Sequence, residues 1–213
     1  MANLNAPKGF SPVGNIQGGS WNEQGRMYAI ASDASNTYAI GDVVMSAASA
    51  DANGVPYVTK WGGATTTSAL PLGIIVGIRV ADPGVSLVGA SLSLEKSYIG
   101  LSAGTRYVYV VDDPMVIFEA QFDSTAVAAT DLHKNAAVTV TANQTSLAVS
   151  SPFSSTVLTS PATTATLPIR LLGLVQRSDN AVGAYCKVLC KWNYHEFGVT
   201  AGASGSVVGY LAP

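Results

Sequence analysis

The chain of 213 residues is 48% hydrophobic but only 11% charged, and its formal net charge is −2 at pH 7. Because an average soluble domain carries about 25% charged residues, this composition predicts a weakly charged surface of the kind that packs against other protein. The charge balance disfavours nucleic-acid binding, which needs clustered Lys and Arg, and no apolar run reaches the roughly 20 residues of a membrane-spanning helix.

The N-terminal 25 residues are rich in Gly, Asn, Gln and Pro and have no hydrophobic period. This pattern predicts an extended arm, residues 1–25, that carries one large anchor, Trp21. Residues 1–15 lack the basic and apolar regions of a secretion signal. We therefore expect the protein to be made in the cytoplasm of its host and, if it leaves, to leave by another route than secretion.

From residue 26 onward, short apolar runs alternate with turn residues, which is typical of β-strands. Strands are expected, in chain order, at 27–32, 38–46, 55–61, 70–80, 84–94, 106–111, 115–122 and 137–142. Between the last two, residues 124–136 have a weak helical pattern with Ser124 or Thr125 as the candidate N-cap.

The last third begins with a Ser/Thr/Ala-rich stretch, residues 143–166, that contains two prolines and predicts a long surface loop. Residues 167–175 and 184–197 then predict a final antiparallel strand pair, followed by a Gly-rich tail, 198–213. Many short strands with at most one short helix predict an all-β fold. We expect an antiparallel β-sandwich or jelly-roll-like barrel that spans residues 26–197.

Two adjacent carboxylates, Asp112 and Asp113, lie between the two most apolar strands of the chain. Asp favours turns because its carboxylate accepts hydrogen bonds from nearby backbone N–H groups, and Pro114 cannot donate to a β-ladder. A catalytic or metal-binding pair would need further ligands or an acid–base partner. We interpret this pair as a hairpin corner rather than a catalytic or metal site.

The two cysteines, Cys186 and Cys190, alternate with Lys187 and Lys191 and share one face of the expected strand with Trp192. Four residues along a strand separate their Cα atoms by roughly 13 Å, whereas a disulfide needs less than about 7 Å. The spacing is also poor for zinc. We expect two buried, reduced thiols.

Short matches to catalytic patterns are weak. Residues 93–96 match S-x-x-K and residues 178–180 match S-D-N, but the third element of that set, K-T-G, is absent. The only histidines, His133 and His195, are interpreted as surface or hydrogen-bonded polar residues rather than bases. We expect no enzymatic activity, no metal and no cofactor.

Aromatic residues of the N-terminal third are the remaining candidates for binding. Exposed on a face or cleft they could contact a protein partner or a sugar, whereas the alternative is packing in the core. The candidate interface residues are Phe10, Trp21, Tyr28, Tyr38 and Trp61.

Over roughly residues 26–197 the chain resembles the capsid cement or decoration proteins of short-tailed bacteriophages. The segments that carry the resemblance are YVYVVDDPMVIFEAQ, at 107–121, and LPIRLLGLVQRSDNAVG, at 167–183. The resemblance implies a β-sandwich or jelly-roll body on the outside of the head, where it bridges neighbouring major capsid subunits. It also implies a virion location and a homo-oligomer at a capsid symmetry axis.

Elementary physics is compatible with such a role, because arms can become ordered on binding and repetition on a lattice adds weak contacts together. We therefore expect residues 1–25, with Phe10 and Trp21 as anchors, to carry much of the capsid contact and to be dispensable for folding. Two other classes stay open. One is a glycan- or receptor-binding module of a phage fibre or tail that uses Trp61 for stacking, and the other is an enzyme of unusual type.

Overall fold

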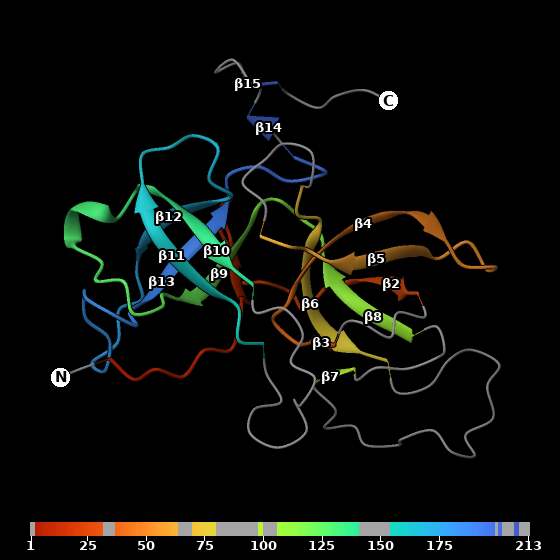
Figure 1. Ribbon diagram of the computed structural model, residues 1–213, viewed down its shortest axis with the longest axis horizontal. Helices are drawn as coiled ribbons and strands as arrows, with labels where there is room; N and C mark the ends of the chain where they lie inside the picture. The colour runs from red at the N-terminus through yellow and green to blue at the C-terminus, as the bar shows by residue number, and fades with distance from the viewer. Residues whose placement is uncertain are drawn as a thin grey trace.

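The computed structural model describes residues 3–31, 37–63, 70–79, 98–99, 106–140, 154–198, 200–201 and 207–208. The fold is all-β, as predicted, with two main layers in a sandwich-like arrangement (Figure 1). One layer is a six-stranded sheet in the order β1-β9-β13-β12-β10-β11, and the other is a closed barrel in the order β2-β5-β4-β6-β8. Two further two-stranded sheets pair β3 with β7 and β14 with β15.

The six-stranded sheet is antiparallel throughout, whereas the barrel closes through one parallel pair, β2 with β5. The strands of the six-stranded sheet are β1 (Ser11–Asn15), β9 (Val116–Gln121), β10 (Asn135–Thr139), β11 (Val157–Ala162), β12 (Ile169–Leu174) and β13 (Lys187–Trp192). The barrel strands are β2 (Arg26–Ile30), β4 (Val43–Ala50), β5 (Pro56–Lys60), β6 (Gly73–Ile78) and β8 (Arg106–Val111). The small sheets contain β3 (Tyr38–Ala39), β7 (Tyr98–Ile99), β14 (Thr200–Ala201) and β15 (Val207–Val208).

Most predicted strands are present, including the antiparallel pair of β12 and β13. The helix predicted over 124–136 is wrong: only a 3-10 turn, η1 (Ala129–Asp131), forms there, and β10 begins at Asn135. The apolar residues of this segment that reach the core, Val127, Leu132 and Ala136, are four or five positions apart and residues 129–131 between them include no buried side chain, so they form no continuous helical stripe. Strand β1 forms within the predicted arm and β11 within the predicted loop 143–166, so both predictions are wrong at these residues, and the two-residue strands β7, β14 and β15 were not predicted either. The expected strand at 84–94 lies outside the described residues, as do residues 93–96.

Neighbouring residues of the barrel strands point into two different cores. Val44, Ile75 and Val110 fill the barrel interior, whereas the residues beside them, Val43, Ile74 and Val111, pack outward against the six-stranded sheet. All six side chains are at most 2% exposed. A strand buried on both faces is an unbroken apolar run rather than an alternating one, which explains the sequences DVVM, GIIVGI and VYVV.

The N-terminal segment is part of this body rather than a separate arm. Phe10 is 1% exposed and stacks on Trp192 with ring centroids 5.9 Å apart. The rings of Phe10 and Phe118 are nearly perpendicular, with centroids 6.3 Å apart. Strand β1 follows immediately and pairs with β9. The expectation that residues 1–25 are dispensable for folding is therefore wrong, because their removal would take an outer strand and a core aromatic from the sheet.

Close backbone packing fixes this segment against the barrel. Gly9 has φ +70°, and a Cβ built there would lie 2.3 Å from the carbonyl oxygen of Gly41. The backbone N–H of Phe10 donates to the same oxygen at 3.1 Å. Only a residue without a side chain permits this approach.

Gly9→Ala should therefore destabilise the protein far more than Gly54→Ala. Gly54 has φ +80° but nothing within 4 Å of its Cβ position, so both variants bear the left-handed backbone cost of roughly 1–2 kcal/mol. Only Gly9→Ala adds steric overlap, which we expect to cost about 1–3 kcal/mol more. Urea denaturation of the two variants measures the difference, and equal unfolding free energies would contradict the close approach.

A buried ion pair lies within the barrel, and its carboxylate also binds the start of the segment that leads to β11. Asp42, 2% exposed, lies 3.0 Å from the Lys60 ammonium, and its carboxylate accepts hydrogen bonds from Ser154 Oγ at 2.5 Å and from the Ala39 backbone N–H at 2.9 Å. Removing one member leaves the other charge buried without compensation.

Asp42→Asn should therefore lower the free energy of unfolding by about 3–5 kcal/mol. A matched control is Glu119→Gln, which breaks the more exposed ion pair of Glu119 with Arg177 and should change stability by about 0–1 kcal/mol. Thermal and urea unfolding of both variants test this ranking. A similar loss for the two would show that the Asp42 pair is no more than an ordinary surface contact.

Both outer strands of the six-stranded sheet carry features that prevent further strands from adding. In β1 the register shifts between Pro12 and Gly14, and in β11 an extra residue bulges around Ser160 (φ +46°) beside Pro161. Proline cannot donate a ladder hydrogen bond, and bulges bend the strand away from a new partner. The body is therefore protected against edge-to-edge association.

The predicted state of the cysteines is confirmed: both are free and buried on the inward face of the sheet beside Val188 and Trp192. Burial raises the pKa of both thiols. Among the described residues, no helix is long and apolar enough to cross a membrane.

Candidate binding groove

Four of the five candidate interface residues lie in the interior. Phe10, Tyr28, Tyr38 and Trp61 are at most 6% exposed, so they pack in the core and cannot contact a partner while the body stays folded. The prediction that they form an interface is wrong, and Trp61 cannot serve as a stacking platform for sugar. A single sequence does not show which aromatic residues the fold buries, because Phe10 lies among Pro, Gly, Lys and Ser and is nevertheless buried, whereas Trp21 in similar surroundings is not.

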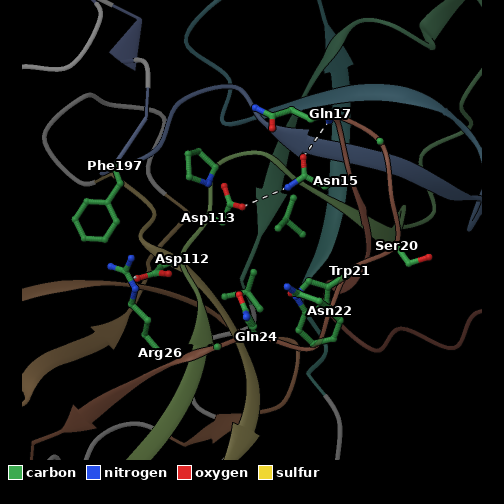
Figure 2. A pocket seen from close by; sticks show the side chains of 15 residues that line it. Asn15, Gln17, Ser20, Trp21, Asn22, Gln24, Arg26, Asp112, Asp113 and Phe197 are labelled. Atoms are coloured by element: carbon green, nitrogen blue, oxygen red, sulfur yellow. Dashed lines mark hydrogen bonds and ion pairs between the residues drawn. The ribbon is translucent and has the colours of Figure 1, made fainter.

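The fifth candidate, Trp21, is half-buried and borders a groove of about 950 Å³ (Figure 2). The groove lies between the loop from Asn15 to Arg26 and the crossover from β8 to β9. Polar side chains predominate around Trp21. The lining includes Asn15, Gln17, Ser20, Trp21, Asn22, Gln24, Arg26, Asp112, Asp113 and Phe197.

The first half of the loop is held by local hydrogen bonds. Asn15 Oδ1 accepts from the Gln17 backbone N–H at 3.0 Å, and the Asn15 backbone N–H donates to the Gly19 carbonyl at 3.2 Å. Gly18 and Gly19 take the left-handed conformation that this turn requires. The turn therefore presents Trp21 and its polar neighbours from a defined backbone.

The carboxylate pair forms a turn, as predicted, but not the corner of a hairpin. Strand β8 pairs with β2 and β6, whereas β9 pairs with β1 and β13, so the turn is the crossover from barrel to sheet. Asp113 accepts a hydrogen bond from the Met115 backbone N–H at 2.8 Å and one from Asn15 Nδ2 at 3.4 Å. It thereby holds both walls of the groove together (Figure 2).

Asp112 has a different environment from its neighbour. Its side chain is largely buried, accepts a hydrogen bond from the Tyr28 hydroxyl at 2.7 Å and lies 3.4 Å from the Arg26 guanidinium. Burial, together with this carboxylate, raises the pKa of Tyr28. With these partners Asp112 stabilises the base of the groove, and among the described residues no group of three or more His, Cys, Asp or Glu is placed to hold a metal ion.

His195 follows β13 and lies two residues before Phe197, which lines the groove. It is 1% exposed, and its Nδ1 accepts a hydrogen bond from the Phe197 backbone N–H at 3.0 Å, which places the ring proton on Nε2. Neither this Nε2 nor Trp192 Nε1 has a hydrogen-bond partner among the described residues. The expectation of a surface location is therefore wrong for His195, whereas the exposed His133 fits it.

Burial lowers the pKa of His195 to about 4, against the opposing effect of the Asp112 and Asp113 carboxylates. An unfolded chain binds this proton near pH 6.5, so between pH 6.5 and 4 the unfolded state holds more protons than the folded state. The free energy of unfolding should fall over this range by up to about 3 kcal/mol.

His195→Asn should flatten this acid-side loss, measured as urea unfolding free energy at pH 7 and at pH 4.5. His133→Asn is the matched control, because His133 is exposed and its φ of +70° is tolerated by Asn. Glu196, whose pKa burial raises, acts in the opposite direction but is common to all three proteins. An unchanged slope in the His195 variant would contradict the assignment.

Sequence reasoning singled out Trp21 but missed the polar residues of the groove. The signal was present in NIQGGSWNEQG, residues 15–25, where amide side chains surround a tryptophan. Residues 178–180, S-D-N, lie in the loop between β12 and β13, where Asn180 Nδ2 donates to the carbonyls of Val175 and Lys187 at 2.8 Å. The loop interpretation of this match is therefore confirmed.

In comparisons with protein-family models, with curated proteins and with solved structures, nothing matched this chain.

Proposed function

We propose that this protein is a structural component of a bacteriophage virion that decorates the outside of the head and holds neighbouring major capsid subunits together. The observation that carries the proposal is a pair of large apolar side chains exposed at one end of the six-stranded sheet. There Leu4 is 76% exposed and Val182 is 46% exposed. We define the distal surface as residues 3–7 and 178–184, which together contain one charged side chain, Asp179.

Hydrogen bonds join the two segments of the distal surface. Asn3 Nδ2 donates to the carbonyls of Ala181 and Ala184 at 2.8 Å, and Asn3 Oδ1 accepts from the Ala181 backbone N–H at 2.9 Å. The N-terminus thus lies at the end of the sheet that faces away from the barrel (Figure 1). A surface that exposes apolar side chains, carries one charge and is held in place by hydrogen bonds needs little charge desolvation and little ordering when it contacts another protein.

The protected outer strands also favour this role. Many copies of a decoration protein stand close together on one shell, where open sheet edges would join them into aggregates. The prolines and bulges of β1 and β11 oppose this, so the copies contact the shell through loops. Weak loop contacts add together when several copies gather as a homo-oligomer around a symmetry axis of the shell. In this role the protein acts at the surface of the virion.

The test uses phage heads assembled without this protein and purified protein added to them. The double variant Leu4→Ser/Val182→Ser should lose at least about tenfold in head occupancy, because both apolar contacts are lost. Val13→Ser is the matched control, since Val13 is 42% exposed on the bulge of β1 and outside the distal surface.

Occupancy is measured by co-sedimentation and by electron microscopy of the heads. Failure of the unaltered protein to bind heads would refute the proposed function. Equal binding by the double variant and the control would refute the distal surface as the contact.

A further inference from the structure

Trp21 separates two hollows that together form an elongated site. On one side is the groove of about 950 Å³, and on the other a hollow of about 610 Å³ that Tyr109, Val76 and Glu23 help to line. Trp21, Gln24 and Gly25 border both. A ligand that follows this path passes over one aromatic side chain and reaches a second, since Tyr109 is 40% exposed.

Small residues keep the second hollow open. A Cβ at Gly77 would lie 3.3 Å from the Tyr109 ring, and a Cβ at Gly25 would lie 3.3 Å from the Val76 side chain. Longer side chains at these positions would project beside the aromatic residues and narrow the path between them.

Four exposed polar residues surround Trp21. The side chains of Gln17, Ser20, Asn22 and Gln24 form no hydrogen bond with the part of the chain that the structure describes. Each side chain can both donate and accept. In Figure 2, Asn22 and Gln24 lie beside Trp21, with Gln17 and Ser20 on the neighbouring turn.

The charges of the site disfavour anions. Asp112, Asp113 and Glu23 place three carboxylates along the two hollows, against the single guanidinium of Arg26. A phosphate, a nucleic acid or an acidic polymer would be repelled, since such ligands are bound by clustered cations. The ligand that matches the site is neutral, rich in hydroxyl groups and able to lay an apolar face on an aromatic ring.

We propose that the site around Trp21 binds a neutral oligosaccharide of at least two sugar rings, such as a glycan exposed on a cell surface. Sugar hydroxyls both donate and accept, as the free amides do, and the C–H face of a sugar ring stacks on tryptophan. The hydrogen bonds of the Asn15 turn and of Asp113 hold the walls in place before binding, which lowers the entropy cost. This activity goes beyond the contact with the head.

The first experiment is an array of immobilised neutral and acidic glycans probed with the full-length protein. We expect neutral oligosaccharides to be bound and acidic ones not to be. Binding confined to acidic glycans, or binding to no glycan at all, overturns the proposal.

The second experiment locates the site with the best neutral oligosaccharide from the array, by titration calorimetry and tryptophan fluorescence. Trp61 and Trp192 are at most 2% exposed, so a fluorescence change on binding reports on Trp21. Trp21→Ala should weaken binding by more than about tenfold, and Asn22→Ala/Gln24→Ala by about tenfold.

Matched controls are Tyr57→Ala, a half-buried aromatic outside both hollows, and Gln176→Ala, an exposed amide near β12. Neither should change the affinity. Because Trp21 also packs against the core, its variant could be destabilised, whereas Asn22 and Gln24 are exposed and their variant should unfold like the unaltered protein. Unchanged glycan affinity in that double variant overturns the proposal.

The two proposals fail separately. Trp21→Ala and Asn22→Ala/Gln24→Ala should still decorate heads if they remain folded, and Leu4→Ser/Val182→Ser should still bind the oligosaccharide. If every variant lost both head decoration and oligosaccharide binding, one surface would serve both activities. That result would contradict a separate glycan site.

Discussion

The apolar contact between the barrel and the six-stranded sheet is the constraint on which the rest of the structure depends. Val43, Ile74 and Val111 project from the barrel and meet the sheet beside Phe118 and Trp192. At about 25 cal/mol per Å² of buried apolar surface, such a contact is the main force that makes the two layers one body. The groove exists because it lies at the rim of this contact, where the β8–β9 crossover and the loop before β2 pass from one layer to the other.

The N-terminal segment takes its importance from the same contact. Phe10 packs against both Phe118 and Trp192, whose rings also contact each other, and the close approach of Gly9 and Gly41 allows the backbone to run tightly past the barrel. Residues that lack hydrophobic periodicity can therefore be essential to a core, because one aromatic side chain in the right place buries as much surface as several smaller ones. Within the N-terminal segment, the parts that stay accessible to a partner are the residues before Phe10 and the loop after β1.

The sequence predicted strands where burial leaves a pattern and failed where it does not. Runs such as GIIVGI predict β-structure because both faces of β6 are buried. By contrast, β1 and β11 each contain a proline and a bulge, which protect an outer strand. The same features interrupt the alternation of apolar and polar residues, so the sequence pattern does not indicate a strand there. The groove was not predictable, because its walls come from residues about 90 positions apart and only the fold shows that Trp21 is accessible while Trp61 is not.

The two surfaces we propose for binding can act at the same time. The distal surface belongs to the N-terminal segment and the loop between β12 and β13, whereas the groove belongs to the loop before β2 and the β8–β9 crossover, and no residue is common to both. The first is apolar and nearly uncharged, which suits permanent contact with protein. The second is polar and lined by carboxylates, so a protein surface that filled it would have to desolvate these groups and pair their charges. A body attached through the distal surface would therefore leave the groove open to solvent, where a soluble or cell-bound sugar chain could enter.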